Sequence, residues 1–275
     1  MVVASGYLSP DCLGTDMEAD EARRRMLKDE FVSKRGYWSP IWNETLRLDP
    51  DFFESYMHFS SVPWVHGTLP PKVRELIYVA IDASTTHLYD PGTRVHMQNA
   101  LRHGATEGEI MEVLELTSVL GIHSATSGVP ILMEELRAAG REHELPPAAP
   151  DARRAALKEE FTRSRGYWAE VWDHVLRLSP EFFEAYMRFS SVPWKNGTLD
   201  PKVREFIYIA IDVATTHLYD PGTRIHIRNA LGYGATAQEI MEVFQLVSVL
   251  GIHTVTSGVP ILAECMKNAR TEAAG

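Results

Sequence analysis

Apolar side chains recur every three to four residues along most of the chain, which is the period of an amphipathic helix. One such stripe contains Val73, Leu76, Ile77, Ala80 and Ile81, and a second contains Ile110, Val113, Leu114 and Thr117. Residues 71–87 are apolar on several sides, which indicates burial within an oligomer as well as within the fold. No stretch alternates as a half-buried strand does. The pattern therefore predicts an all-α protein.

Helix-end signals divide this pattern into short elements. Pro70 and Pro71 precede the first stripe, as proline does at a helix start. Residues 106–109 and 236–239 both fit a capping box, and Gly104 and Gly234 fit left-handed helix ends. The Asp-Pro pair in residues 89–92 disfavours a continuing helix and predicts a turn.

The chain contains the same pattern twice, at an offset of 130 residues. Residues 59–64 return unchanged as 189–194, residues 85–94 as 215–224, and residues 118–123 as 248–253. A unit of this size is a duplicated domain rather than a short solenoid repeat. A fused duplicate can bury within one chain the surface that a single copy would bury in a symmetric dimer.

The repeat sets the predicted domain boundaries. We expect an N-terminal tail over residues 1–20, a first repeat over 21–140, a proline-containing linker over 141–150 and a second repeat over 151–270. Each repeat is predicted to be a bundle of six or seven helices.

Composition excludes several classes of function. The net charge is −10 and no basic block is present, so nucleic acid is not an expected partner. No apolar run approaches the length of a membrane span and no leader pattern is visible, which predicts a water-soluble, cytoplasmic protein. Cys12 and Cys265 are the two cysteines, and no CxxC pair is present. A disulfide framework, a cysteine metal site and dithiol chemistry are therefore not expected.

Six of the eleven histidines form three pairs that recur at the same position in both repeats. The pairs are His87/His217, His96/His226 and His123/His253. Each lies at or near the end of a predicted helix, where side chains commonly line a cleft and histidine can exchange a proton near neutral pH. The alternative is that they are buried hydrogen-bonding residues that tie helix ends together.

Three other recurring pairs are candidate site residues. Glu75/Glu205 lies on the same broad helix face as His87/His217 and could point a carboxylate toward the same cavity, or else is a solvated or salt-bridged helix residue. Arg94/Arg224 could bind a substrate carboxylate through the planar guanidinium group, or be a surface cation. Trp64/Trp194 is expected to pack in a wall of the fold, with or without a ligand beside it.

The order and spacing of these residues resemble the carboxymuconolactone decarboxylase family. The resemblance rests on Trp64, Leu69-Pro70, the helix over residues 74–80, Arg94-Val95-His96, Asn99-Ala100, residues 104–106, Glu109-Ile110, Glu112-Val113 and Gly121-Ile122, with the same set from Trp194 to Ile252. It implies a small helical domain that oligomerises through its long helices as trimers or hexamers. It also implies a cofactor-free decarboxylase branch, whose Arg-x-His histidine falls on His96 and His226.

The chain departs from the hydroperoxidase branch of that family. That branch uses a CxxC pair, a following histidine and an upstream glutamate, and Glu75 falls on the glutamate. His87 and Asp90 stand where the two cysteines would be, and the loop to His96 is two residues longer. Peroxidase chemistry is therefore not expected.

The leading functional prediction is a cofactor-independent lyase or isomerase that acts on a small carboxylated lactone or enol. Arg94/Arg224 would hold a carboxylate and His96/His226 would return a proton as general acid. The other two histidine pairs would relay or tune that proton, with Glu75/Glu205 nearby. The expected assembly is a homo-oligomer, for example a trimer of two-domain chains.

Two alternatives remain at this point. One is a zinc or other divalent metal site formed by His87, His96 and His123, and by His217, His226 and His253. The other is a non-catalytic ligand-binding duplicate, because a fold does not dictate a function.

Overall fold

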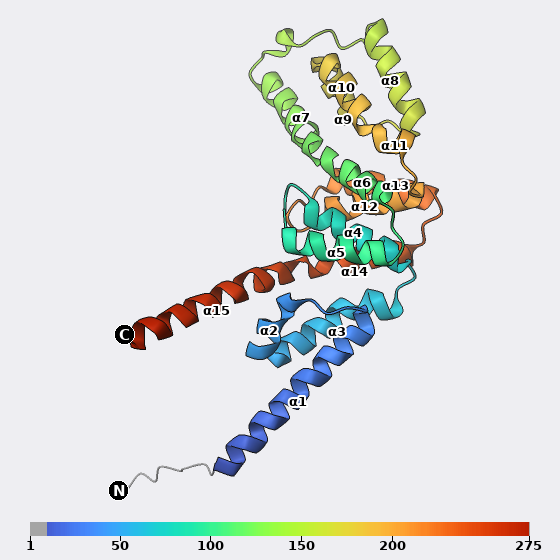
Figure 1. The fold of residues 1–275 in the computed structure, drawn as a ribbon. Coiled ribbons are helices and arrows are strands. Elements are labelled where there is room, and N and C mark those ends of the chain that lie inside the picture. The colour runs from blue at the N-terminus through green and yellow to red at the C-terminus, as the bar shows by residue number, and fades with distance from the viewer. Residues whose placement is uncertain (1–9, 275) are drawn as a thin grey trace. The chain divides into compact units, whose positions relative to one another are not determined.

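The computed structural model describes residues 10–274, and within that range it contains helices and no strand (Figure 1). The first repeat contains α1 (Pro10–Arg35), η1 (Pro40–Trp42), α2 (Asn43–Leu48), α3 (Pro50–His66), α4 (Pro71–Ala83), α5 (Asp90–Arg102), α6 (Glu107–Ser118), η2 (Val119–Ile122) and α7 (His123–Ala138). The connection contains η3 (Glu142–Glu144), and the second repeat contains α8 (Ala152–Arg165), α9 (Val171–Leu178), α10 (Pro180–Ser190), α11 (Val192–Asn196), α12 (Pro201–Val213), α13 (Asp220–Gly232), α14 (Ala237–Ser248), η4 (Val249–Ile252) and α15 (His253–Ala274). The all-α prediction is confirmed.

The predicted helix signals are present in the structure. The stripe from Val73 to Ile81 is buried along α4. The side chains of Thr106 and Glu109 cap α6 reciprocally, and those of Thr236 and Glu239 make the same pair of hydrogen bonds before α14. Gly104 has a φ of 83°, which is the left-handed conformation that glycine adopts without a steric penalty.

The structure differs from the sequence pattern at two places. Residues 10–20 of the predicted tail belong to α1, and residues 1–9 lie outside the described residues. The helix that starts at Pro71 ends at Ala83 rather than at His87, because Ser84, with φ of −54° and ψ of 138°, leaves the helical conformation. The turn therefore comes earlier, and Asp90-Pro91-Gly92 begins α5, where proline fits the first helical turn.

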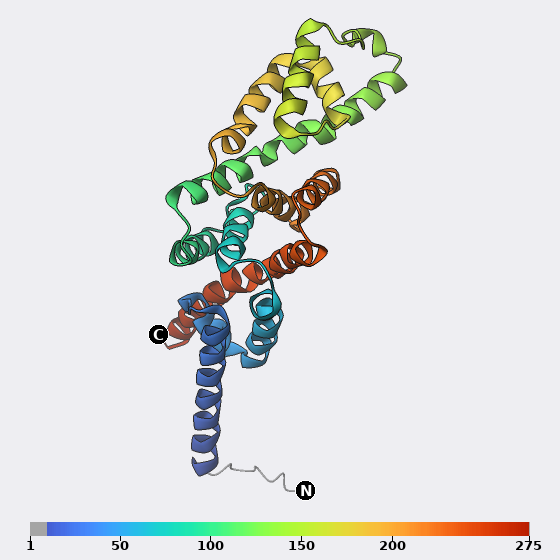
Figure 2. The same ribbon diagram turned by 90° about the vertical axis from the view of Figure 1, so that its right-hand side faces the viewer.

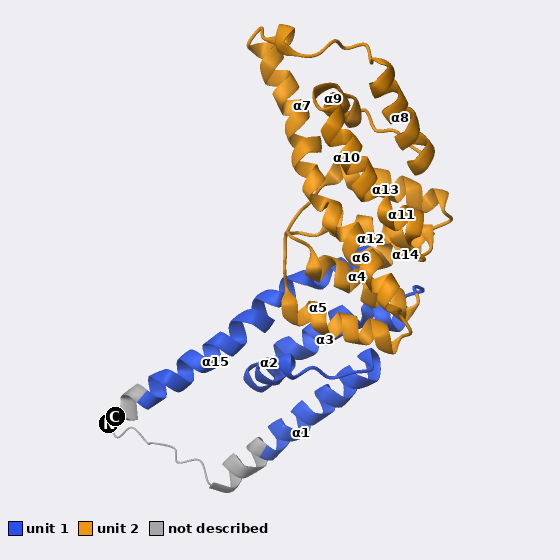
Figure 3. Cartoon of the chain, turned by 45° about the horizontal axis from the view of Figure 1, so that its top comes forward, with its two compact units in different colours: residues 1–69, 244–275 blue, residues 70–243 orange. Residues whose placement is uncertain are grey.

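The chain divides into two compact units that do not follow the repeats (Figure 3). Unit 1 contains residues 1–69 and 244–275, and unit 2 contains residues 70–243. The predicted boundaries at 21–140 and 151–270 instead delimit the sequence repeats. The difference arises because the last helix of each repeat packs on helices that begin the other repeat.

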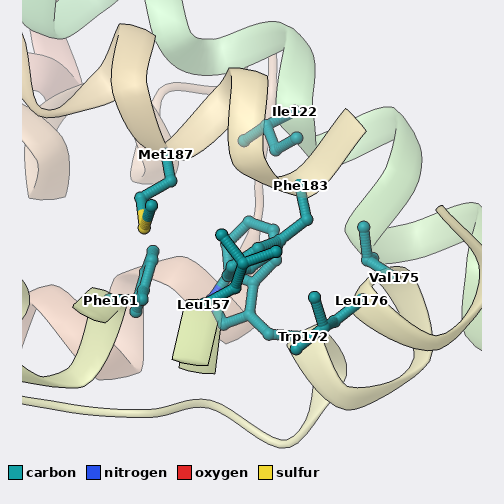
Figure 4. Close-up of a cluster of buried hydrophobic side chains, with 8 residues drawn as sticks. All are labelled: Ile122, Leu157, Phe161, Trp172, Val175, Leu176, Phe183 and Met187. Atoms are coloured by element: carbon teal, nitrogen blue, oxygen red, sulfur yellow. The ribbon is translucent and has the colours of Figure 1, made fainter. Parts of the chain in front are cut away.

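In unit 2, α7 of the first repeat packs against α9 of the second, beside α8 and α10 (Figure 2). Ile122, which precedes α7, is part of the buried cluster that joins them (Figure 4). The remaining members of that cluster are Leu157, Phe161, Trp172, Val175, Leu176, Phe183 and Met187. Removal of this apolar surface from water fixes α7 to the second repeat.

Unit 1 has the corresponding arrangement with the repeats exchanged. The helix α15 of the second repeat packs against α2 of the first. Ile252 lies in a buried cluster with Leu27, Phe31, Trp42, Leu46, Phe53 and Met57. The same packing therefore holds both final helices.

Two buried ion pairs join the repeats inside unit 2. Arg74 Nε of α4 donates to Glu242 Oε1 of α14 at 2.6 Å, and Arg204 Nε of α12 donates to Glu112 Oε1 of α6 at 2.6 Å. Glu112 Oε2 also accepts from the backbone N–H groups of Thr198 and Leu199. All four charged side chains are less than 10% exposed, so each pair is a strong positional constraint.

The predicted linker at residues 141–150 is held by arginine side chains of the second repeat. Arg154 donates to the carbonyl oxygens of Pro147 and Ala149, and Arg177 donates to that of Pro146. The linker carbonyls therefore have charged donors although no helix continues through them.

Two helical stretches, Glu107–Ala138 and Ala237–Thr271, are long and apolar enough to cross a membrane by length and composition. This is weak evidence of a membrane location, because core helices of water-soluble proteins pass the same test. Each stretch also contains a 3₁₀ turn and an internal proline, at Pro130 and Pro260. The cytoplasmic location stays a prediction.

We expect Glu112→Ala to lower the free energy of unfolding by about 3–5 kcal/mol, because it leaves Arg204 buried without its counter-charge. Chemical denaturation of the full chain measures this change. Arg141→Ala is the control, because the Arg141–Glu144 pair is solvent-exposed and its loss should leave the denaturation midpoint unchanged. Equal midpoints for the two variants would contradict the structural importance of the buried pair.

We expect Gly222→Ala to destabilise the chain by about 1–3 kcal/mol, because a new methyl group would overlap the carboxylate of Asp212. A Cβ at this position would lie 2.1 Å from Asp212 Oδ2 and 2.7 Å from a ring carbon of Tyr219. Gly232→Ala in the same helix is the matched control. Nothing lies within 4 Å of its added Cβ, so the higher helix propensity of alanine should leave stability unchanged or raised by up to about 1 kcal/mol. Thermal denaturation compares the two variants, and a stable Gly222→Ala chain would contradict the close approach.

Candidate functional site

Unit 2 contains a small cavity of about 60 Å³ between helices of both repeats. Its lining includes Arg165, Trp194, Glu205, Asp212 and His226 of the second repeat, and His123 of the first. Glu205 and Asp212 are seven residues apart on α12, which is two helical turns, so both carboxyl groups lie on one face. The helix α13 supplies His226 to the same cavity.

Glu205 and His226 form a hydrogen-bonded dyad. His226 Nδ1 lies 2.6 Å from Glu205 Oε2, and Asn229 Nδ2 donates to Glu205 Oε1 at 3.3 Å. The imidazole stacks on the ring of Tyr208, with centroids 4.5 Å apart. Because the carboxylate accepts from Nδ1–H, Nε2 is the ring nitrogen that remains for proton exchange.

The first repeat contains the same dyad within unit 2. His96 Nδ1 lies 2.6 Å from Glu75 Oε2, Asn99 donates to Glu75 Oε1, and His96 stacks on Tyr78. His96 Nε2 also lies 3.9 Å from Asp82 Oδ2. The recurrence of these distances shows that the duplication preserved the geometry as well as the letters.

A second group of polar side chains combines the two repeats. His123 Nδ1 lies 2.6 Å from His217 Nε2 and 3.8 Å from Asp212 Oδ1. The His123 ring stacks on Tyr219 with centroids 3.8 Å apart, and the Tyr219 hydroxyl donates to Thr126 Oγ1 at 2.6 Å. His123 begins α7, so the packing of that helix on the second repeat carries its imidazole to this position.

A tight turn after α12 contains His217, Leu218 and Tyr219. The N–H groups of His217 and Leu218 donate to the carbonyl of Ala214, and Tyr219 N–H donates to that of Asp212. Leu218 has a φ of 54°, which is unusual for a residue other than glycine and costs conformational energy. Leu88 has the same conformation in the first repeat, so both repeats accept this strain.

Burial changes the proton affinities of the cavity groups. It raises the pKa of Asp212 to about 7, although the nearby His226 acts in the opposite direction. It lowers the pKa of His123 to about 3, with the adjacent His217 contributing. Burial also raises the pKa of Tyr208 and of Tyr219. His123 is therefore a neutral imidazole at physiological pH.

Arg165 is the cation in the cavity wall. Its Nη2 donates to the carbonyl oxygen of Ser190 at 2.6 Å, and the guanidinium group lies 5.3 Å from the ring centroid of Trp194. The indole N–H of Trp194 donates to the Tyr208 hydroxyl at 3.3 Å. The structure thus joins a positive charge, a flat aromatic wall and a phenol at one side of the cavity.

The structure brings together some of the predicted site residues and separates others. Glu205, His226, Trp194 and His123 line the cavity, and His217 contacts His123. Arg94 and Arg224 point to solvent instead, with side chains more than 70% exposed. Each arginine pairs with the aspartate four residues before it, which begins the same helix and lies one turn away on the exposed face.

The remaining predicted residues are in the first repeat or in unit 1. His87 lies in the turn after α4, and burial lowers its pKa. Trp64 lies in unit 1 with the guanidinium group of Arg35 over its ring at 4.8 Å. His253 begins α15.

Sequence reasoning missed Asp212, Tyr219, Tyr208 and Arg165 as site residues. All four recur 130 residues apart, as Asp82, Tyr89, Tyr78 and Arg35, so the signal used for the histidines was also available for them. Asp212 and Tyr208 lie within the apolar α12 pattern, where they resemble core positions. They differ from ordinary core residues because all four line the cavity, which only the tertiary structure shows.

Among the described residues of unit 2, one group could hold a metal ion. The ligand atoms of His123, Asp212 and His217 all lie within 4.8 Å of one another. This set differs from the predicted histidine sets, because His226 is engaged with Glu205 and an aspartate takes part.

Known proteins agree with this fold and duplication. A sequence profile described as the Carboxymuconolactone decarboxylase family matches residues 50–142 and 180–264. A crystal structure from Burkholderia xenovorans, provisionally named a gamma-carboxymuconolactone decarboxylase subunit, is 48% identical in sequence with a TM-score of 0.85. The match covers 90% of this chain and 98% of that one. No curated protein matches the chain. The profile matches most of both repeats, and the chain therefore belongs to the carboxymuconolactone decarboxylase family.

Proposed function

We propose that the cavity is the active site of a decarboxylase-like lyase or isomerase that acts on a small carboxylated lactone or enol. The observation that carries the proposal is the Glu205–His226 dyad, in which a buried carboxylate orients one partly buried imidazole and leaves its Nε2 for proton transfer. The name given to the similar Burkholderia xenovorans protein supports the same reaction class.

The substrate carboxylate would be bound by Arg165 rather than by Arg224. Arg165 lines the cavity, whereas the Arg224 side chain is exposed and paired with Asp220. A guanidinium group can bind a carboxylate through two parallel N–H donors, which fixes the orientation of a small planar ring. Trp194 would pack against the face of that ring.

The dyad would supply the proton that completes the reaction. Loss of carbon dioxide leaves the electron pair of the broken C–C bond on the substrate as a dienolate. His226 as imidazolium would donate its Nε2 proton to a carbon of that dienolate, and Glu205 would stabilise the positive charge that the imidazole carries before the transfer. In an isomerase the same group would remove and return a proton. Neither the decarboxylation nor the isomerisation needs an organic cofactor.

The oligomeric state and a non-catalytic alternative are separate from the proposed reaction. The homo-oligomer, for example a trimer of two-domain chains, stays a prediction. A non-catalytic binding protein would use the same cavity, but it would bind a carboxylated lactone without forming product. Measurement of product formation distinguishes the enzyme from the non-catalytic binding protein.

The test is the double variant His96→Asn/His226→Asn. Asparagine keeps an N–H donor near the position of Nδ1, so the buried glutamates retain a partner and the fold should persist. We expect turnover of a carboxylated lactone panel, measured as carbon dioxide release, to fall by about 100-fold or more, because general acid catalysis contributes on that scale. Circular dichroism should be unchanged.

His143→Asn is the matched control, because His143 is exposed in the linker and should not affect turnover. Retained turnover in the double variant would contradict the role of the dyad. Binding of the panel to the unmodified chain without carbon dioxide release or isomer formation would favour the non-catalytic alternative.

A further inference from the structure

We propose that His123, Asp212 and His217 form a site for a divalent transition-metal ion at the wall of the cavity. Two imidazole nitrogens and one carboxylate oxygen are a ligand set typical of zinc and of non-haem iron. The three side chains come from α7, α12 and the turn after α12, so the fold assembles them from distant parts of unit 2. The proposal goes beyond the acid–base function above and does not depend on it.

The distances fit a shared ion after a small adjustment. His123 Nδ1 and His217 Nε2 are 2.6 Å apart, and Asp212 Oδ1 lies 3.8 Å from His123 Nδ1. Ligands about 2.0–2.2 Å from a tetrahedral ion lie more than about 3 Å from one another. The two rings would therefore have to part by somewhat more than half an ångström. His217 lies in the turn after α12 and is only partly buried, so rotation of its ring would supply this adjustment.

The carboxylate of Asp212 also favours a bound cation. Its Oδ2 is buried and has no hydrogen-bond partner, which is costly for a carboxylate. The adjacent Gly222 leaves no room for a side chain that could donate to it. A bound cation would compensate the buried charge directly.

An ion held by these three residues would keep an unfilled coordination position. Three protein ligands leave at least one position on a zinc or iron ion for water or substrate. His123 and Asp212 both line the cavity that also contains the Glu205–His226 dyad. An ion at this site could bind an oxygen of a carboxylate or enolate, which is the functional group that the cavity is proposed to accept.

A hydrogen bond between the two imidazoles is the competing explanation. The ring planes differ by 19°, and one proton between Nδ1 and Nε2 would satisfy both nitrogens. That explanation leaves Asp212 Oδ2 without a partner and predicts no affinity for metal ions. Metal binding by the purified chain distinguishes the two.

The experiment is a titration of the chelator-treated full chain with Co²⁺, followed by absorption spectroscopy, and with Zn²⁺, followed by calorimetry. The variants are Asp212→Asn and His217→Gln, which keep the size and polarity of the side chains. We expect each to lose one equivalent of bound ion per chain relative to the unmodified protein. The loss should exceed the roughly 10–100-fold in affinity that follows removal of an outer hydrogen-bond partner.

Two controls keep the outcome interpretable. His143→Gln removes an exposed histidine and should bind as much ion as the unmodified chain. The double variant His96→Asn/His226→Asn should also keep the ion while losing turnover, so failure of the proposed catalysis and failure of the metal site give different results. Absence of tight Co²⁺ and Zn²⁺ binding by the unmodified chain, or equal stoichiometry in the folded Asp212→Asn and His217→Gln variants, would overturn the proposal.

Discussion

The buried ion pairs Arg74–Glu242 and Arg204–Glu112 are the constraint on which the rest of unit 2 depends. Each guanidinium group has to be placed within hydrogen-bond distance of a carboxylate from the other repeat, because a buried charge without its partner is strongly destabilising. The pairs therefore hold α4 to α14 and α12 to α6, and they fix the rotation of α4 and α12 about their axes. The helix α12 carries Glu205 and Asp212 on one face, so the same constraint positions both carboxyl groups of the cavity.

Exchange of the final helices explains why the cavity needs both repeats. The helix α7 packs on the second repeat through the cluster that contains Ile122, and His123 follows that residue directly. Apolar burial thus delivers a polar side chain to the cavity at a fixed position. In unit 1, Ile252 and α15 pack on the first repeat in the same manner. A duplicated chain can meet within itself the packing requirement that a single-domain relative would meet with another subunit.

Two carboxyl groups of the cavity have opposite environments. Glu205 accepts hydrogen bonds from His226 and Asn229. Asp212 has a buried oxygen without a partner and a pKa raised to about 7 by burial. This asymmetry assigns orientation of the imidazole to Glu205, whereas Asp212 keeps a buried oxygen atom that no hydrogen bond satisfies. The strained backbone at Leu218, which brings His217 toward Asp212, is consistent with a local function rather than with stability.

The sequence by itself determined the helices, their caps, the duplication and the family, because hydrophobic periodicity, capping residues and a fixed offset are local or linear properties. It also selected Glu205, His226 and His123 through their recurrence at an offset of 130 residues. Only the tertiary structure decided that His123 meets His217, that Arg165 rather than Arg224 lines the cavity, and that the compact units do not follow the repeats. These facts depend on which faces of distant helices pack together. That packing is set by apolar burial and by buried ion pairs between residues more than 90 positions apart. A local residue pattern does not show which of these distant residues meet.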